Sequence, residues 1–397
     1  MNPNIGTLYK IAKQPARTII GLMSGTSFDG LDVALCEFRG TGTQTSVNVK
    51  HFVTKEYKPE FKEEIKSVFA RKEADLEKVT LLNAFIGSYY AELIQECLDE
   101  WKVSNDEVDL IASHGQTIFH APKHHRPDDA YGNATLQIGD ADHLAVRSGI
   151  ITLSDFRQKH IAAGGEGAPL AVYGDYLIFS DPTENRIMLN VGGIANFTYL
   201  PAGRTDQFFS TDAGPGNTLM DQYVQAHFPG LYYDKDSAIA SKGTVNTALL
   251  NTLLDNGFFN APFPKTTGPE LFNMTYLDRA MKASNQNDLS ANDILATLAY
   301  FSAKAIIDAI ETTVKQTGSF EIYVSGGGMY NPLLISHIEN HFSQTIKSTT
   351  HLGINPDAKE AVLFALLANE AVAGNADTLK SIAGIPRVFM GKISFPQ

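Results

Sequence analysis

Residues 18–35 read TIIGLMSGTSFDGLDVAL, and residues 186–197 read RIMLNVGGIANF. Each stretch places two apolar runs around a turn rich in glycine and in hydroxyl or amide side chains, a pattern that predicts a β-hairpin. Glycine lets backbone N–H groups approach an anion with no Cβ in the way. Two such hairpins in one chain indicate two related lobes that grip one phosphate chain. The alternative for each is an ordinary hairpin whose glycines serve only the turn.

The length and composition indicate a folded protein with two domains. A chain of 397 residues exceeds the size at which single cores stop growing, and 43% of its residues are hydrophobic. The formal charge of −12 argues against a nucleic-acid partner, because no segment gathers the lysines and arginines that phosphate backbones require. Cys36 and Cys97 are isolated, so neither a disulfide framework nor a thiolate zinc site is expected. No secretory signal or membrane span is evident, and we expect a cytoplasmic location and no membrane partner.

The order of predicted elements is that of an α/β protein. Residues 1–16 are polar and are expected to form a loose extension. Apolar positions at three- and four-residue steps predict helices over 75–101 and 293–314, and short apolar runs predict strands at 108–113 and 321–325. We place one lobe at 1–150 and a second at 151–375, with a tail at about 376–397 that can pack back on the first lobe.

Three segments outside the hairpins carry candidate chemistry. Ser325-Gly326-Gly327-Gly328 follows an apolar strand and precedes a helical segment, a corner that admits a base or a phosphate closely. Neither a Rossmann fingerprint nor a Walker loop occurs in the chain. Asp212, at the expected end of a strand before a Pro/Gly turn, is a candidate general base, with a carboxylate that only satisfies turn amides as the alternative. Asp155-Phe156-Arg157 offers a guanidinium that can clamp a carboxylate or phosphate, or else a salt bridge within its own loop.

His114 stands at the expected end of the 108–113 strand and is interpreted as a ligand contact or as a structural histidine. His120, His124 and His125 follow it, but their spacing matches no helical metal-binding pair, so a metal site is not expected there. In the first hairpin, Asp29 or Asp32 could hold magnesium directly or through water.

Taken together, these segments resemble the anhydro-N-acetylmuramic acid kinases over about residues 18–392. The matching blocks occur in the family's order: Gly25-Thr26-Ser27-x-Asp29-Gly30-x-Asp32, Ser113-His114-Gly115-Gln116-Thr117, Asp155-Phe156-Arg157, Gly167-Ala168-Pro169-Leu170, Asn190-x-Gly192-Gly193-Ile194-Ala195-Asn196, Asp212-x-Gly214-Pro215-Gly216-Asn217, Pro264-Lys265-Thr266-Thr267-Gly268 and Gly326-Gly327-Gly328-x-x-Asn331.

The resemblance implies the fold of actin, Hsp70 and the sugar kinases, with two RNase H-like lobes, ATP in the cleft between them and magnesium as the metal. It implies that water opens the 1,6-anhydro bridge of the sugar while O6 takes the γ-phosphate of ATP, giving an intermediate of cell-wall recycling, and it suggests a homodimer. Carried onto this chain, it makes Asp212 the base and places His114, Arg157 and Glu360 near the sugar, although a solvated helix-start carboxylate is the alternative for Glu360. The implied ATP-binding residues are Gly25, Thr26, Ser27, Phe28, Asp29, Gly30, Leu31, Asp32, Gly192, Gly193, Gly326, Gly327, Gly328 and Asn331.

The chain departs from the family pattern at positions that bear on the sugar. His160 stands where family members carry a second Asp, three residues after Asp-Phe-Arg; Pro269 stands where Arg often follows the Thr-Gly pair, and Ala171-Val172 replaces the usual Val-Pro. Two rival functions therefore stay open: a kinase for another anhydrosugar, such as levoglucosan, and a non-catalytic nucleotide-binding sensor of the same fold.

Overall fold

The computed structural model describes residues 2–123, 126, 130–168, 170–203, 207–315, 317–375, 386 and 388–397. The chain forms two compact units: unit 1 comprises Met1–Phe179 with Ala358–Gln397, and unit 2 comprises Ser180–Asp357. This division differs from the boundary expected near residue 150, because the strand Thr152–Ser154 (β6) pairs in the sheet of unit 1. Residues 376–385 and 387 of the expected 376–397 tail lie outside the described residues. Lys392–Ser394 (β12) pairs with β6 in unit 1.

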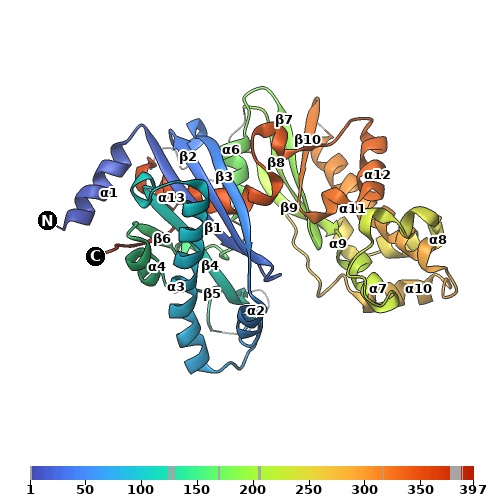
Figure 1. Cartoon of the computed structure of the whole chain (residues 1–397). Helices are drawn as coiled ribbons and strands as arrows, with labels where there is room; N and C mark the ends of the chain where they lie inside the picture. The colour runs from blue at the N-terminus through green and yellow to red at the C-terminus, as the bar shows by residue number, and fades with distance from the viewer. Residues whose placement is uncertain are drawn as a thin grey trace. The chain divides into compact units, whose positions relative to one another are not determined.

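Unit 1 is built on a mixed sheet with helices on both faces (Figure 1). Its other described elements are α1 (Pro3–Lys13), β1 (Ala16–Ser24), β2 (Gly30–Arg39), β3 (Ser46–Glu56), α2 (Pro59–Lys66), α3 (Leu76–Trp101), β4 (Leu110–Ala121), β5 (Ala134–Ile138), α4 (Ala141–Ser148), α5 (Phe156–Ala162), α6 (Ala171–Phe179) and α13 (Lys359–Ala373). The strand order is β12-β6-β4-β1-β2-β3, with β5 paired to β4. β1 pairs antiparallel with β2, and β2 pairs antiparallel with β3. On its other side β1 pairs parallel with β4, and β4 pairs parallel with β6.

Alternation along β1 explains how α3 and α13 come to cover opposite faces of this sheet. Leu22 lies in a buried cluster with Ile86, Tyr90 and Ile94 of α3. The neighbouring Gly21 faces α13, where a Cβ on the glycine would lie 1.9 Å from the Ala361 carbonyl oxygen. Glycine at this position therefore allows strand and helix backbones to pack at close range.

Unit 2 repeats the same sheet plan. Its elements are β7 (Asn185–Val191), β8 (Ile194–Leu200), β9 (Phe209–Pro215), α7 (Thr218–His227), α8 (Thr247–Leu254), α9 (Gly257–Asn260), α10 (Met274–Ala283), α11 (Ala291–Val314), β10 (Phe320–Ser325), α12 (Pro332–Phe342) and β11 (Lys347–Ser348), with short 3-10 helices η4 (Lys235–Ser237) and η6 (Gly327–Tyr330). The order β11-β10-β7-β8-β9 puts the first strand in the centre, as β1 is in unit 1. Both units thus have the strand order of an RNase H-like lobe, and the predicted α/β fold class is confirmed.

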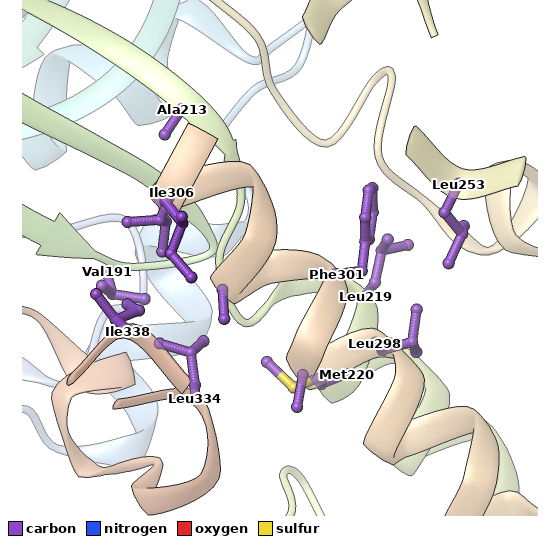
Figure 2. Close-up of a cluster of buried hydrophobic side chains, with 14 of the residues drawn as sticks. Val191, Ala213, Leu219, Met220, Leu253, Leu298, Phe301, Ile306, Leu334 and Ile338 are labelled. Carbon is purple, nitrogen blue, oxygen red and sulfur yellow. The ribbon is translucent and has the colours of Figure 1, made fainter. Parts of the chain in front are cut away.

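The core of unit 2 gathers around α11, most of whose buried residues are apolar. Figure 2 shows part of this cluster, which includes Val191 and Ala213 from the sheet and Leu298, Phe301 and Ile306 of the helix. Val191 directly precedes the Gly192 turn and Ala213 directly follows Asp212, so the second hairpin and the candidate base both rest on packed side chains.

The predicted elements are largely confirmed, with corrections at their ends. Both hairpins form, as do the helices over 75–101 and 293–314 and the strand over 321–325. The loose extension expected over 1–16 was wrong, because Asn2 caps a helix that begins at Pro3. The Asp155 loop leads at once into α5. Among the described residues, no helix combines the length and the apolar composition needed to cross a membrane.

Candidate functional site

The turn of the first hairpin leaves open space above its backbone. Gly25 has a negative φ, and the one described atom within 4 Å of a Cβ placed there is Ser27 Oγ, at 3.8 Å. Neither backbone strain nor packing explains this glycine, and close approach of a ligand would. Thr26, Ser27 and Asp29 are exposed around it, as a phosphate-binding turn requires.

Three residues of the predicted phosphate segment have packing roles in unit 1. Phe28 and Leu31 are buried in the core, at 6% and 0% exposure, so only their backbone could meet a ligand. A Cβ on Gly30 would lie 2.5 Å from the Lys55 carbonyl oxygen, which accounts for this glycine by strand packing alone.

A buried polar network supports the turn from below. Ser24 Oγ donates to Gln116 Oε1 at 2.5 Å, and Gln116 Nε2 donates to the Gly25 carbonyl at 3.2 Å. The Tyr57 hydroxyl lies 2.7 Å from Ser24 Oγ and 3.0 Å from the Tyr90 hydroxyl. These contacts fix the start of the turn through side chains from β4, from α3 and from the loop between β3 and α2. Gln116 lies in a sequence block noted above, but Tyr57 and Tyr90 carry no motif that could have revealed them.

The two magnesium candidates differ in their surroundings. Asp29 is exposed in the turn, whereas Asp32 lies within β2 and accepts a hydrogen bond from Thr54 Oγ1 at 2.6 Å. Across the described part of the chain, no group of three or more His, Cys, Asp or Glu residues is placed to hold a metal. This donor set fits a Mg²⁺ held mainly by phosphates and water, with one aspartate nearby. His124 and His125 lie outside the described residues.

The second hairpin presents a similar open turn in unit 2. A Cβ on Gly192 or Gly193 would meet nothing closer than 3.6 Å. Their carbonyls accept from backbone N–H groups of the segment that enters α7: Gly216 N and Thr218 N donate to Gly193, and Asn217 N donates to Gly192, over 2.8–3.1 Å. The turn is therefore tied to a helix N-terminus, where an anion is stabilised.

A cavity of about 480 Å³ opens beside this turn, entirely within unit 2. It is lined by Asn217, Met220, Asp221, Tyr233, Asp234, Lys235, Asp236, Gly327, Tyr330 and Asn331. Two half-exposed tyrosines and several polar groups in a volume of this size suit a nucleoside. Burial raises the pKa of Asp221 to about 6.

The glycines at the edge of this cavity divide by role. A Cβ on Gly327 would meet no atom closer than 4.0 Å, whereas on Gly328 it would lie 2.2 Å from Val191 Cγ1. Gly326 has a φ of +84° and also abuts Val191. Asn331 lines the cavity, but its Oδ1 already accepts from Leu334 N as the cap of α12. Of the four predicted positions, Gly327 thus has the most open space for a ligand.

Asp212 lies within β9 at a break in strand register, rather than at the strand end expected from the sequence. Asn196 of β8 pairs with Asp212 and Ala195 pairs with Gly214, so Ala213 is the extra residue of a β-bulge. Bulges commonly re-aim a side chain beside an active site.

One oxygen of the Asp212 carboxylate is held by a hydrogen bond, and the group is poorly solvated. The Thr267 N–H donates to its Oδ2 at 2.8 Å. Burial raises the pKa of Asp212 to about 6; the Thr267 hydrogen bond opposes this shift and the charge of Glu270 adds to it. A carboxylate with one oxygen held, and with a pKa close to neutral, is suited to general-base catalysis.

The three predicted sugar contacts gather in unit 1. Arg157 Nε donates to His114 Nε2 at 2.9 Å, and Arg157 Nη1 donates to the Gly167 carbonyl at 2.7 Å. The Arg157 charge also acts on Glu360 at the start of α13. Desolvation by the surrounding protein raises the pKa of Glu360, and the positive charges of Arg157 and Lys359 oppose this shift. Part of the Glu360 residue is nevertheless exposed to solvent. Asp155 pairs with Lys392 rather than with Arg157.

His114 also lies at a register break, inside β4 and not at its end. Leu22 pairs with Ser113 and Ser24 pairs with Gln116, so two residues of β4 face one of β1. The His114 side chain is 3% exposed, and burial, with a smaller effect of the Arg157 cation, lowers its pKa to about 3. The ring is therefore neutral and accepts from Arg157 at Nε2.

The family resemblance placed His114, Arg157 and Glu360 together near the sugar, and the structure brings these three residues together in unit 1. Sequence reasoning missed Asp221, Tyr233 and Tyr330, which line the cavity of unit 2. An aspartate one turn into a helix after the Asp-x-Gly-Pro-Gly-Asn block is the one signal that could have suggested Asp221.

Comparison with known proteins identifies the family. The family model described as anhydro-N-acetylmuramic acid kinase matches residues 17–396. Curated relatives of that name include one from Pseudoalteromonas atlantica, 54% identical with all of both chains covered, and one from Pseudoalteromonas translucida, 52% identical with the same coverage. Another, from Caldanaerobacter subterraneus, is 36% identical over 98% of this chain and 99% of its own. The chain belongs to the anhydro-N-acetylmuramic acid kinase family.

Proposed function

We propose that this protein uses ATP to convert anhydro-N-acetylmuramic acid to N-acetylmuramic acid 6-phosphate. The observation that carries the proposal is Asp212, a carboxylate with one oxygen held by Thr267 N–H and a pKa raised to about 6. The names of the relatives, at up to 54% identity over whole chains, support the substrate.

The proposed reaction makes and breaks two bonds with one base. Asp212 takes a proton from water as the water oxygen bonds to C1 of the sugar. The C1–O6 bond breaks, and O6 takes the γ-phosphoryl group as its bond to ADP breaks. The opening inverts C1, and phosphoryl capture of the leaving oxygen replaces the general acid of an ordinary inverting glycosidase. A second catalytic carboxylate is then unnecessary.

The nucleotide is proposed to bind to the open glycine turns and the cavity of unit 2. The Gly25 turn and the Gly192-Gly193 turn offer backbone N–H groups to phosphates, and the cavity at Gly327 takes the nucleoside, with Tyr233 or Tyr330 against the base. Mg²⁺ would be held by the phosphates and water near Asp29 or Asp32, where it would neutralise phosphate charge.

The sugar is proposed to contact His114, Arg157 and Glu360. Two hydrogen bonds hold the Arg157 guanidinium in place, and a held guanidinium is a strong partner for a carboxylate. Anhydro-N-acetylmuramic acid carries a lactyl carboxylate and levoglucosan does not, so this group favours the muramic sugar over the rival substrate.

The test supplies purified protein with ATP, Mg²⁺ and either anhydro-N-acetylmuramic acid or levoglucosan, and identifies products by mass spectrometry. The proposal predicts a phosphorylated muramic sugar from the wild type, and an Asp212→Asn variant that binds ATP but turns over about 10²–10⁴ times more slowly. Product from levoglucosan alone would transfer the assignment to that sugar. ATP binding without product from either sugar would favour a nucleotide-binding sensor.

We propose that the reaction serves peptidoglycan recycling in the cytoplasm, because its product is the phosphate of a cell-wall sugar. We also propose a homodimer, on the family resemblance. Sedimentation equilibrium tests this assignment, and a mass of one chain of 43.3 kDa at micromolar concentration would refute it.

A further inference from the structure

His160 lies next to the candidate sugar contacts, but its ring points at backbone. The side chain is 5% exposed on α5, three residues after Arg157. Its Nδ1 accepts from the Gly167 N–H at 2.9 Å. A nitrogen that accepts carries no proton, so the neutral ring holds its proton on Nε2.

The turn that His160 contacts packs closely against the imidazole ring. A Cβ on Gly165 would lie 2.2 Å from His160 Cε1, so the backbone passes directly against the imidazole. Gly165 N also donates to the His160 carbonyl at 2.9 Å, and Asn133 Nδ2 donates to the Gly165 carbonyl at 3.1 Å. The Tyr173 ring packs against the His160 ring in a T-shaped arrangement, with the ring centroids 6.0 Å apart.

Gly167 links this turn to Arg157. Its N–H donates to His160, while its carbonyl accepts from Arg157 Nη1 at 2.7 Å. Since the two groups belong to adjoining peptide units, a shift of the turn away from His160 moves the carbonyl that holds the guanidinium. Arg157 in turn donates to His114 Nε2.

We propose that His160 is a positioning residue: its neutral imidazole fixes the 164–167 turn, and through Gly167 it holds Arg157 for the sugar. The charged and titratable groups facing the ring are Arg157, Glu166 and Tyr173. Burial and the Arg157 cation lower the pKa of His160 while Glu166 raises it, so the accepting form persists at neutral pH. The kinetic part of the inference rests on the proposed function.

Two substitutions separate the acceptor from the ring. His160→Asn loses the ring but places its amide oxygen where Nδ1 stood, whereas His160→Phe keeps the ring and loses the acceptor. We expect His160→Phe to raise KM for anhydro-N-acetylmuramic acid at least tenfold, with KM for ATP and kcat within about threefold. His160→Asn should stay within about threefold on all three constants. Gly165→Ala, which drives a methyl group into the ring, should resemble His160→Phe.

A second measurement does not depend on turnover. The Arg157 cation helps to keep His114 from protonating, so release of Arg157 should let the His114 ring titrate at higher pH. NMR of ring-labelled histidine should show His114 untitrated at pH 5 in the wild type and in His160→Asn, and an upward pKa shift in His160→Phe.

The inference is overturned if His160→Phe and His160→Asn have the same sugar KM, or if the His114 titration is alike in all three proteins. Thermal unfolding and ATP binding check that each variant folds. Should the wild type phosphorylate neither sugar, the proposed function fails on its own, and the NMR titration still decides the role of His160.

Discussion

Acidification from pH 8 to pH 5 should reduce turnover about tenfold, because it protonates Asp212. The proposed base acts as a carboxylate, and burial with the Glu270 charge raises its pKa to about 6. Protonation therefore removes the active form below this pH. About half of the molecules remain active at pH 6 and roughly a tenth at pH 5, so kcat should fall about tenfold per pH unit on the acid side.

The assay measures product by mass spectrometry at saturating sugar and Mg-ATP, from pH 8 to pH 5. Glu270→Gln removes a negative charge near Asp212, so the midpoint of the profile should shift to lower pH. Comparison of the two proteins cancels any titration of the nucleotide itself. Asp212→Asn should reduce kcat by about 10²–10⁴, the usual contribution of a general base. A kcat that stays constant from pH 7 to pH 5, or a midpoint unmoved by Glu270→Gln, would refute this reasoning.

Three further predictions concern binding and stability. Gly327→Ala should weaken ATP binding without loss of stability, whereas Gly328→Ala should lower the unfolding temperature because its Cβ would lie 2.2 Å from Val191. Calorimetric titration measures ATP binding and thermal unfolding measures stability; identical behaviour of the two variants would contradict the assigned roles. His114 stays neutral in the folded protein to about pH 3 but protonates near pH 6.5 when unfolded, so its contribution to the free energy of unfolding is full above pH 6.5 and falls by up to about 1.4 kcal/mol per pH unit between these values. Urea unfolding at pH 7 and pH 5 should show a smaller loss of stability in His114→Gln than in the wild type. An equal loss in the two proteins would count against this role of His114. Gln116→Leu leaves the Ser24 hydroxyl and the Gly25 carbonyl without this partner, at a cost of about 1–3 kcal/mol, and an unchanged calorimetric midpoint would exclude that cost.

Local pattern predicted the fold well because both hairpins and both long helices are specified by nearby residues. The glycine turns were visible in the sequence. The sequence did not distinguish the glycines that leave space for a ligand from those that close packing requires. Gly25 and Gly327 have open space above them, whereas Gly30 and Gly328 are required by atoms of distant residues. That distinction depends on packing, which a sequence does not display.

The ends of elements and the grouping of the site depend on tertiary pairing. Asp212 and His114 were expected at strand ends but lie on register breaks inside longer strands, because pairing with β8 and β1 continues beyond them. The boundary expected near residue 150 missed the pairing of β6 with β4. Asp221 and Tyr233 line the unit 2 cavity from α7 and from the loop that follows it, outside the glycine motifs themselves.

The central claim is that Asp212 activates a water that opens the anhydro bridge as O6 is phosphorylated. The most direct test is turnover of anhydro-N-acetylmuramic acid with ATP and Mg²⁺ in oxygen-18 water, with the label located by tandem mass spectrometry. The account predicts one heavy oxygen at C1 of the 6-phosphate product and none in its phosphate, and formation of labelled product by Asp212→Asn about 10²–10⁴ times more slowly. Heavy oxygen in the phosphate, or unlabelled product, would contradict it.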